Sequence, residues 1–175
     1  EHDIDRVLGF SQQVTVMNQG EVLMTGPPEA VRNDRRVQEI YTGTGLPAVA
    51  HSPTLSSARE TAPILRFEAV NTFYGKSHIL HDATLDVRSG EIVALLGRNG
   101  AGKSTLLKTL AGLVPLQSGE IAFAGRDIAR LAAPDIARLG IGYVPQGRGL
   151  FAGMTVRENL ALGRLARKSD GSEGA

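Results

Sequence analysis

The stretch LLGRNGAGKSTLLKTLAG, residues 95–112, decides the fold class of this chain. Residues 97–104 satisfy the pattern G-x-x-x-x-G-K-[ST], which is typical of a phosphate-binding loop. The mostly apolar run EIVALLG precedes the pattern and predicts a fully buried strand. The run KSTLLKTLAGL follows it with the apolar spacing of a helix. A strand, a glycine-rich turn and a helix in this order predict a site for a polyphosphate.

Each residue type in the loop has a chemical reason. Phosphate oxygens must be surrounded by consecutive backbone N–H groups, and glycine removes the Cβ atoms that would obstruct their approach. The following helix directs the partial positive charge of its amino end at the phosphates. Lys103 is expected to contact the β and γ phosphates, Ser104 to ligate Mg²⁺ and Thr105 to bind the α phosphate. The expected ligands are ATP and Mg²⁺, and the expected phosphate-binding residues are Gly97, Asn99, Gly100, Ala101, Gly102, Lys103, Ser104 and Thr105.

Length and composition narrow the class of protein. The 175 residues suit one domain or pieces of two, with 42% hydrophobic and 21% charged residues. A net charge of +1 gives no argument for binding to nucleic acid or to a membrane surface. The absence of cysteine excludes disulfides and thiolate metal sites and favours a reducing compartment. No signal peptide is visible, and no apolar run approaches the roughly 20 residues of a membrane span, so we expect a cytosolic protein.

The first part of the chain, residues 1–43, predicts a small hairpin with helices. The β-rich runs VTVMN and EVLMT flank a Gln-Gly pair, and a Gly-Pro-Pro sequence leads into the helical pieces EAVRND and RRVQEIY. An isolated hairpin is marginally stable in water, so we expect the tail of something larger that is mobile or packs opportunistically. Residues 44–64 have the Pro, Ser, Thr, Ala and Gly content of a linker.

Strands and helices alternate through residues 65–168. LRFEAV and ATLDV alternate like half-buried antiparallel strands, GEIAFAG and IGYVPQ predict further strands, and PDIARLG predicts a helix. TVRENLALGRLAR begins with Thr155 and has Glu158 three residues on, which predicts a capping box. The expected fold class is therefore α/β, a P-loop NTPase core with an antiparallel β portion. Residues 169–175 are expected to be a flexible end.

At this point the sequence resembles the ATP-binding subunits of ABC transporters. LLGRNGAGKSTLLKTLAGL, followed by SGEIAFAGRDI and GYVPQ, matches their nucleotide-binding domain in order and spacing. YVPQGRGLFAGMTVRENLALG looks most like the ATPase subunits of branched-chain amino acid importers, with urea or short-chain amide importers as close relatives. The resemblance covers residues 65–168 and implies the amino-terminal half of an ABC ATP-binding domain.

The resemblance also implies roles for residues outside the loop. Tyr74 matches the aromatic that stacks on adenine, and Gln146 matches the glutamine that reaches Mg²⁺ and the attacking water. Residues 147–158 would receive a coupling helix from a transmembrane subunit, with Phe151 and Met154 either exposed apolar contacts or ordinary core residues. The implied partners are a second ATP-binding domain, transmembrane permease subunits and, indirectly, a substrate-binding protein. The implied location is the cytoplasmic face of the cell membrane.

The opening residues EHDID resemble the other end of the same family domain, where a strand ends in Glu-His-Asp. By that resemblance His2 is a switch histidine that contacts the γ phosphate, and residues 1–43 are the carboxyl-terminal piece of a first ABC domain. The chain is then expected to be part of a tandem of two ATPase domains. His2 and Lys103 would belong to different domains and would serve different ATP sites.

Two elements that ABC ATPases need for hydrolysis are absent from residues 1–175. These are the later apolar Walker B strand, which ends in Asp-Glu and carries the catalytic glutamate, and the Leu-Ser-Gly-Gly-Gln signature. We therefore expect ATP binding with little or no turnover by this chain, and hydrolysis coupled to import by the complete parent. The alternative is a non-catalytic nucleotide-binding or assembly module. Another P-loop enzyme such as a kinase or GTPase is disfavoured, because no Asn-Lys-x-Asp sequence follows for guanine and because the segment around Gln146 is not explained by that hypothesis.

Overall fold

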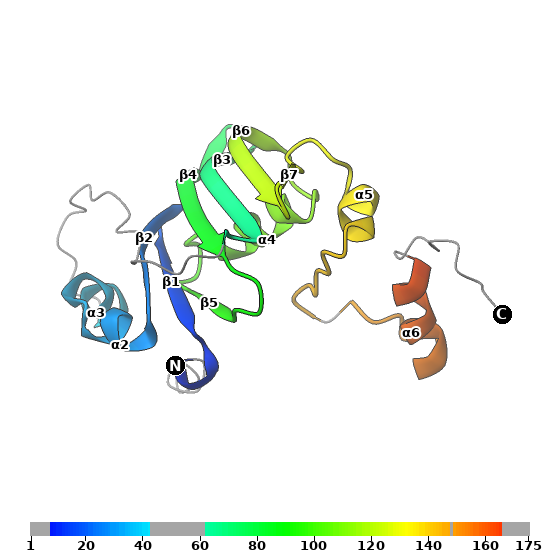
Figure 1. Ribbon diagram of the computed structural model, residues 1–175, viewed down its shortest axis with the longest axis horizontal. Helices are drawn as coiled ribbons and strands as arrows, with labels where there is room; N and C mark the ends of the chain where they lie inside the picture. Colours follow the sequence, from blue (N-terminus) through cyan, green and yellow to red (C-terminus); the bar gives the residue numbers. More distant parts are fainter. Residues whose placement is uncertain (1–7, 43–61, 148, 166–175) are drawn as a thin grey trace.

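The computed structural model describes residues 8–42, 62–147 and 149–165. Its strands are β1 (Gln13–Asn18), β2 (Glu21–Gly26), β3 (Leu65–Tyr74), β4 (Ser77–Val87), β5 (Val93–Leu96), β6 (Leu116–Phe123) and β7 (Arg126–Asp127). Its helices are α2 (Pro28–Asn33), α3 (Arg35–Thr42), α4 (Lys103–Leu110), α5 (Ala133–Arg138) and α6 (Val156–Leu165). The strands form a sheet of order β2-β1-β5 and a sheet of order β4-β3-β6-β7 (Figure 1). The expected mixed α/β content is confirmed.

The hairpin predicted around the Gln-Gly pair is present. β1 and β2 pair antiparallel, and Gln19 and Gly20 turn the chain with φ values of 48° and 88°. These positive values suit a two-residue hairpin turn, whose twist matches that of the flanking strands. The helices predicted after the Gly-Pro-Pro sequence are also present as α2 and α3.

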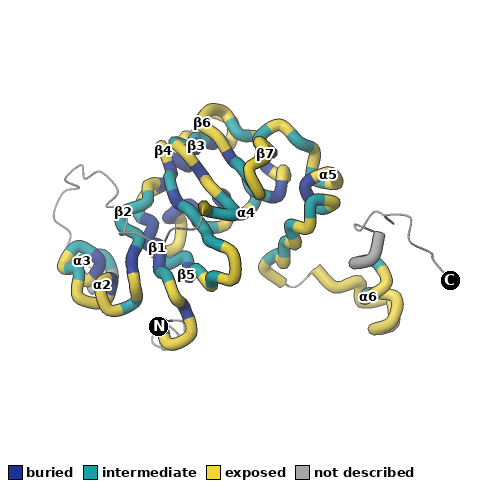
Figure 2. The backbone as a smooth tube through the Cα atoms, viewed as in Figure 1, coloured by how far each residue is buried: buried dark blue, intermediate teal, exposed yellow. Residues whose placement is uncertain are grey.

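The hairpin was expected to be mobile or to pack opportunistically, and the structure shows it packed on β5. β1 runs parallel to β5, the strand that leads into the glycine-rich loop, with Val14 opposite Ala94 and Val16 opposite Leu96. β1 therefore lies between two strands and is buried along its length (Figure 2). The exposed fraction is 0% for both valines. Because β1 pairs with β5, the hairpin is part of a three-stranded sheet.

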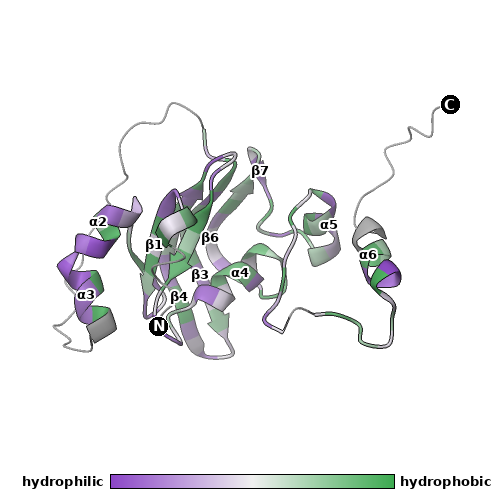
Figure 3. Ribbon diagram, turned by 90° about the horizontal axis from the view of Figure 1, so that it is seen from below, coloured by the Kyte–Doolittle hydropathy of each residue, from purple (hydrophilic) through white to green (hydrophobic). Residues whose placement is uncertain are grey.

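β1 contributes side chains to two hydrophobic cores, because successive side chains of a strand point to opposite faces of the sheet. Val14 and Val16 face one side, where they pack with residues of α2, α3 and β5. Met17 faces the other side and joins the core between the larger sheet and α4. That core also contains Phe67, Val70, Leu80, Ala83, Leu85, Ala101, Leu106, Ile121 and Ile128. Figure 3 shows hydrophobic residues along the strands and α4, with hydrophilic residues over much of α2 and α3.

Two expected strands differ from the structure. EIVALLG forms only the four residues of β5, and of these only Ala94 is buried, because β5 has a strand partner on one side alone in the described sheet. IGYVPQ, residues 141–146, was expected to be a strand but has no regular secondary structure. Backbone N–H and C=O groups form a ladder only beside another strand, and the described residues offer none there. The expectation for residues 141–146 is wrong for that reason.

The carboxyl-terminal helix α6 has the predicted capping box. The N–H of Thr155 donates to Glu158 Oε2 at 2.8 Å, and the N–H of Glu158 donates to Thr155 Oγ1 at 3.3 Å. The hydrogen bond from the Thr155 N–H, and next the one from its hydroxyl, lower the pKa of Glu158. Figure 1 shows α6 standing apart from both sheets, so this local cap holds a helix with little tertiary support. None of the helices in the described ranges is long and apolar enough to cross a membrane.

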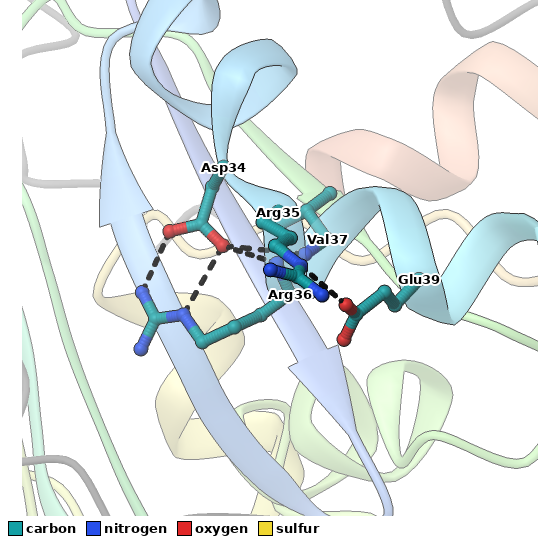
Figure 4. Close-up of polar contacts among 5 residues, drawn as sticks. All are labelled: Asp34, Arg35, Arg36, Val37 and Glu39. Carbon is teal, nitrogen blue, oxygen red and sulfur yellow. Dashed lines mark hydrogen bonds and ion pairs between the residues drawn. The ribbon is translucent and has the colours of Figure 1, made fainter. Parts of the chain in front are cut away.

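A second cap starts α3, at Asp34. Asp34 Oδ1 accepts hydrogen bonds from the N–H groups of Arg36 at 2.8 Å and Val37 at 3.3 Å (Figure 4). The Arg36 guanidinium also donates to both carboxylate oxygens, at 3.1 and 2.7 Å. That guanidinium, and after it the two backbone N–H groups, hold the pKa of Asp34 below its ordinary value, against burial, which raises it.

Replacement of Asp34 should weaken the fold in a pH-dependent way. Asp34→Ala is expected to lower the free energy of unfolding by about 1 kcal/mol at pH 7, the usual cost of losing such a cap. A carboxyl with a lowered pKa stabilises the fold fully above its unfolded pKa, and this stabilisation is lost as the pH falls through the folded pKa. Urea unfolding at pH 7 and at stepwise lower pH measures both effects. Asp34→Asn keeps a capping oxygen without the charge, so a pH dependence equal to that of the parent chain would exclude Asp34 as its source.

Candidate functional site

The predicted strand, loop and helix are present in the structure. β5 ends at Leu96, residues 97–102 form the loop, and α4 begins at Lys103. Gly102 precedes the helix with a φ of 99°, and no side chain caps α4 at this end. The first N–H groups of a helix have no partner within the helix. These groups, together with the helix dipole, suit an anion and therefore fit the polyphosphate that the sequence predicts.

The three glycines of the motif have different environments. A Cβ at Gly97 would lie 2.3 Å from the carbonyl oxygen of Met17, and one at Gly102 would lie 2.9 Å from Leu80 Cδ2. A Cβ at Gly100 would meet no atom within 4 Å, although its φ of 85° still favours glycine. The expectation that all three glycines make room for phosphate is therefore incomplete. Two of them make room for the protein itself.

Lys103 bends back over the loop. Its Nζ donates to the carbonyl oxygen of Gly97 at 2.5 Å and to that of Arg98 at 2.9 Å. Within the described ranges its ammonium has no carboxylate partner. A lysine held only by carbonyl dipoles can turn toward an anion and gain a stronger, charge-assisted contact. The position of Lys103 therefore fits its predicted role.

The residues after Lys103 differ in burial. Ser104 is exposed at the amino end of α4 and is free to reach a ligand, whereas Thr105 is 8% exposed. The carbonyl oxygen of Thr105 accepts a hydrogen bond from Thr109 Oγ1 at 2.9 Å, and the Thr109 hydroxyl lies 3.2 Å from that of Thr72 on β3. The buried hydroxyls of Thr109 and Thr72 therefore tie α4 to the larger sheet. Sequence reasoning missed this contact, because Thr72 and Thr109 carry no local signal of it.

Tyr74 lies at the end of β3, where the chain turns into β4. It is 45% exposed and pairs with Ser77 across the turn, so its ring is available for stacking. The neighbouring Phe73 ring stacks on His78 at a centroid distance of 4.1 Å, and His78 lies 3.8 Å from His81. These ring contacts lie beside Tyr74 at the end of the hairpin.

The remaining predicted site residues do not join the loop. Gln146 is exposed in the irregular segment between α5 and α6, and no hydrogen bond among the described residues links it to the loop. His2 lies outside the described residues, as do most of the expected linker and the flexible end. Among the described residues, no group of three or more His, Cys, Asp or Glu could hold a metal ion. A role for Gln146 in binding Mg²⁺ stays a prediction.

The segment between α5 and α6 exposes apolar side chains. Phe151 is 58% exposed and Met154 43%, and neighbouring Leu150 and Val156 are also exposed. Asn159 of α6 holds this segment in place. Its side chain accepts a hydrogen bond from the N–H of Phe151 at 3.0 Å and donates to the carbonyl oxygens of Phe151 at 3.1 Å and Met154 at 3.3 Å. Sequence reasoning missed this function of Asn159.

Comparison with known proteins gives the family. A family profile described as "ABC transporter" matches residues 80–174, which is more than half of the chain and includes the loop and α4. The chain belongs to the ABC transporter family. A second profile, described as "Branched-chain amino acid ATP-binding cassette transporter", matches residues 21–46 of this family member, which include β2, α2 and α3.

Individual ABC proteins resemble the chain over part of their length. The high-affinity branched-chain amino acid transport ATP-binding protein BraG of Pseudomonas aeruginosa is 49% identical over 107 residues, which are 61% of this chain and 46% of BraG. The probable branched-chain amino acid transport ATP-binding protein LivF of Archaeoglobus fulgidus is 41% identical over 99 residues, 57% of this chain and 42% of LivF. The chain thus spans less than half the length of these two relatives.

A solved structure supports the ABC ATPase fold. The structure described as "Structure of ATP binding subunit of ABC transporter" is 33% identical to this chain, with a TM-score of 0.54. The match covers 62% of this chain and 44% of that one. The P-loop fold expected from residues 95–112 is therefore confirmed.

Gly97→Ala should cost more stability than a glycine substitution made elsewhere. The new Cβ would combine an unfavourable φ with an overlap on the Met17 carbonyl oxygen, and a loss of roughly 3 kcal/mol of unfolding free energy is expected. Gly125→Ala is the control, since Gly125 has a φ of 75° but open space around it, and should cost about 1–2 kcal/mol. Urea unfolding of both variants measures the difference. Equal losses would contradict a close contact between the loop and β1.

Proposed function

We propose that this chain is part of the ATP-binding component of an ABC importer for branched-chain amino acids. The observation that carries the proposal is the phosphate loop, with its uncapped helix, open Gly100 and a lysine bonded only to carbonyl groups. The names of BraG and LivF describe both relatives as ATP-binding proteins, which supports ATP as the ligand of the loop. The match of residues 21–46 and the names of the two relatives support branched-chain amino acids as the solute.

In this proposal the loop residues divide the work of binding MgATP. The N–H groups of residues 97–105 surround the phosphates, Lys103 neutralises charge on the β and γ phosphates, and Ser104 ligates Mg²⁺. Tyr74 stacks on adenine from the end of β3. Gln146 approaches Mg²⁺ and the attacking water, which requires the irregular segment around it to move or to be ordered by a partner.

Turnover is proposed to need groups that residues 1–175 do not supply. A polarising base and a second anchor for Mg²⁺ are required for attack by water. Neither the strand ending in Asp-Glu nor the Leu-Ser-Gly-Gly-Gln signature occurs in this sequence. We expect the chain alone to bind ATP with little or no hydrolysis, and the whole importer to couple hydrolysis to transport.

The domain arrangement is also a proposal. Residues 1–43 are assigned to the end of a first ATP-binding domain, 44–64 to a linker and 65–168 to the front half of a second. The match of residues 21–46 to a different profile from that of residues 80–174 supports two pieces. In a tandem parent His2 would serve the ATP site of the first domain, apart from Lys103.

The proposed partners are a second ATP-binding domain and the transmembrane permease subunits, with a substrate-binding protein acting through the latter. The exposed apolar segment around Phe151 and Met154 supports a permease contact, because Asn159 already fixes its backbone. Such a contact would hold the protein at the cytoplasmic face of the membrane.

Lys103→Ala tests the proposed function directly. Calorimetry should detect MgATP binding by the parent chain and a loss of affinity of at least about 100-fold in the variant, because charge-assisted bonds to phosphate are removed. Lys108→Ala removes a positive charge from the last turn of the same helix and should bind normally. Phosphate release should equal that of buffer for all three proteins. Lys103-dependent turnover would show that another residue supplies the base.

Tyr74→Ala tests the proposed adenine contact. It should weaken MgATP binding by about 1–3 kcal/mol, the usual value of stacking on a base, while Tyr74→Phe keeps the affinity. Binding of inorganic tripolyphosphate should be the same for all three chains, because that ligand has no base. Equal losses for ATP and tripolyphosphate in Tyr74→Ala would instead mean that the substitution distorts the loop.

A further inference from the structure

The end of β1 and the turn between β1 and β2 contact the phosphate loop. β1 and β5 end side by side, with Val16 opposite Leu96, so the next residue of β1, Met17, lies beside Gly97. The approach is closest between backbones, since a Cβ at Gly97 would lie 2.3 Å from the Met17 carbonyl oxygen. The loop therefore begins against β1, and the space available to its first residue is set by the hairpin.

Gly20 joins the loop to the larger sheet by backbone hydrogen bonds. Its N–H donates to the carbonyl oxygen of Ala101 at 3.1 Å, and its carbonyl oxygen accepts from the N–H of His81 on β4 at 3.0 Å. Its φ is 88°, and a Cβ there would lie 2.1 Å from the carbonyl oxygen of Ile79. Only glycine fits between the loop and β4 at this distance.

The end of the loop, at Gly102, also packs closely against Met17 and Gly20 of the hairpin. A Cβ at Gly102 would lie 3.4 Å from Gly20 Cα and 3.4 Å from Met17 Cε. Met17 itself is 0% exposed and packs in the core that contains Ala101 and Leu106. Both ends of the loop are therefore anchored on the hairpin, while Gly100 in its middle faces open space.

We propose that Met17 and Gly20 are positioning residues for the phosphate loop of residues 97–104 in this chain, where the hairpin packs on β5 even though the proposed tandem assigns the hairpin and the loop to different domains. A loop that binds phosphate through its N–H groups must hold them convergent before the ligand arrives, or part of the binding energy is spent in ordering it. The hairpin supplies that order through one hydrogen bond at Ala101 and close packing at both ends. This inference rests on the proposed function, since the ligand is taken to be MgATP.

The test compares alanine substitutions at glycines with matched controls in the full chain. Gly20→Ala should raise the dissociation constant for MgATP about tenfold, through loss of the bond to Ala101 and displacement of the turn. Gly26→Ala lies in the same hairpin with its nearest atoms at 3.7 Å, and Gly125→Ala has a comparable φ in open space. Both controls should bind within about twofold of the parent chain.

The choice of temperature distinguishes a role of Met17 and Gly20 in positioning the loop from a role in stability alone. Affinities are taken at a temperature where circular dichroism shows each variant to be fully folded, so lower stability alone leaves the dissociation constant unchanged. Met17→Ala should also weaken binding, and Met17→Leu should restore it by keeping the volume of the side chain. This pair keeps the test available if Gly20→Ala does not fold.

Amide hydrogen exchange provides a readout without nucleotide. In unliganded Gly20→Ala, or in Met17→Ala, amides of residues 97–102 should exchange faster, while those of β3 and β6 exchange as in the parent chain. Folded variants with parental exchange in the loop and parental affinity would overturn the inference. If the parent chain binds no MgATP, the proposed function fails, and the exchange of the loop alone decides whether the hairpin positions it.

Discussion

The parallel ladder between β1 and β5 is the interaction on which the rest of this structure depends. β5 is short and would be an isolated strand without β1, because α4 and the larger sheet offer it no backbone partner in the described chain. The ladder places Val14 and Val16 in one core and Met17 in the other. It also fixes the end of β5, from which the phosphate loop begins. The backbone hydrogen bonds between β1 and β5 therefore hold the smaller sheet together, place residues of β1 in both cores and fix the start of the phosphate loop.

Features encoded by neighbouring residues were predicted from the sequence. The Gln-Gly turn of the hairpin, the proline at the first position of α2, the loop motif with its helix and the capping box of Thr155 and Glu158 all depend on residues within a few positions of one another. Each has a chemical reason that needs no knowledge of the remaining chain. The resemblance to ABC ATP-binding subunits rested on the same local motifs, and the family profile confirms membership of the ABC family over residues 80–174.

Features that depend on distant residues were not predicted. The amino-terminal hairpin was expected to be mobile or to pack opportunistically, because residues 1–43 lack the sheet that they would normally cover, and its pairing with β5 was not predicted. IGYVPQ has a strand-like composition, but a strand needs a neighbour, and the described residues give it none. The reason for Gly97 was only partly predicted, since the carbonyl of Met17 that it must avoid comes from another part of the chain. Roles for Gln146 and His2 stay predictions.

The order of the strands along the chain has a consequence for how the molecule folds. β3 and β4 are joined by a short turn and can pair early, whereas the contact of Gln12 with Ile92, beside the β1–β5 ladder, joins residues 80 positions apart. Closing so long a loop costs chain entropy before any ladder bond repays it. We therefore expect the hairpin to dock after β3 and β4 have paired. The phosphate loop is then expected to acquire its final shape only in that last step.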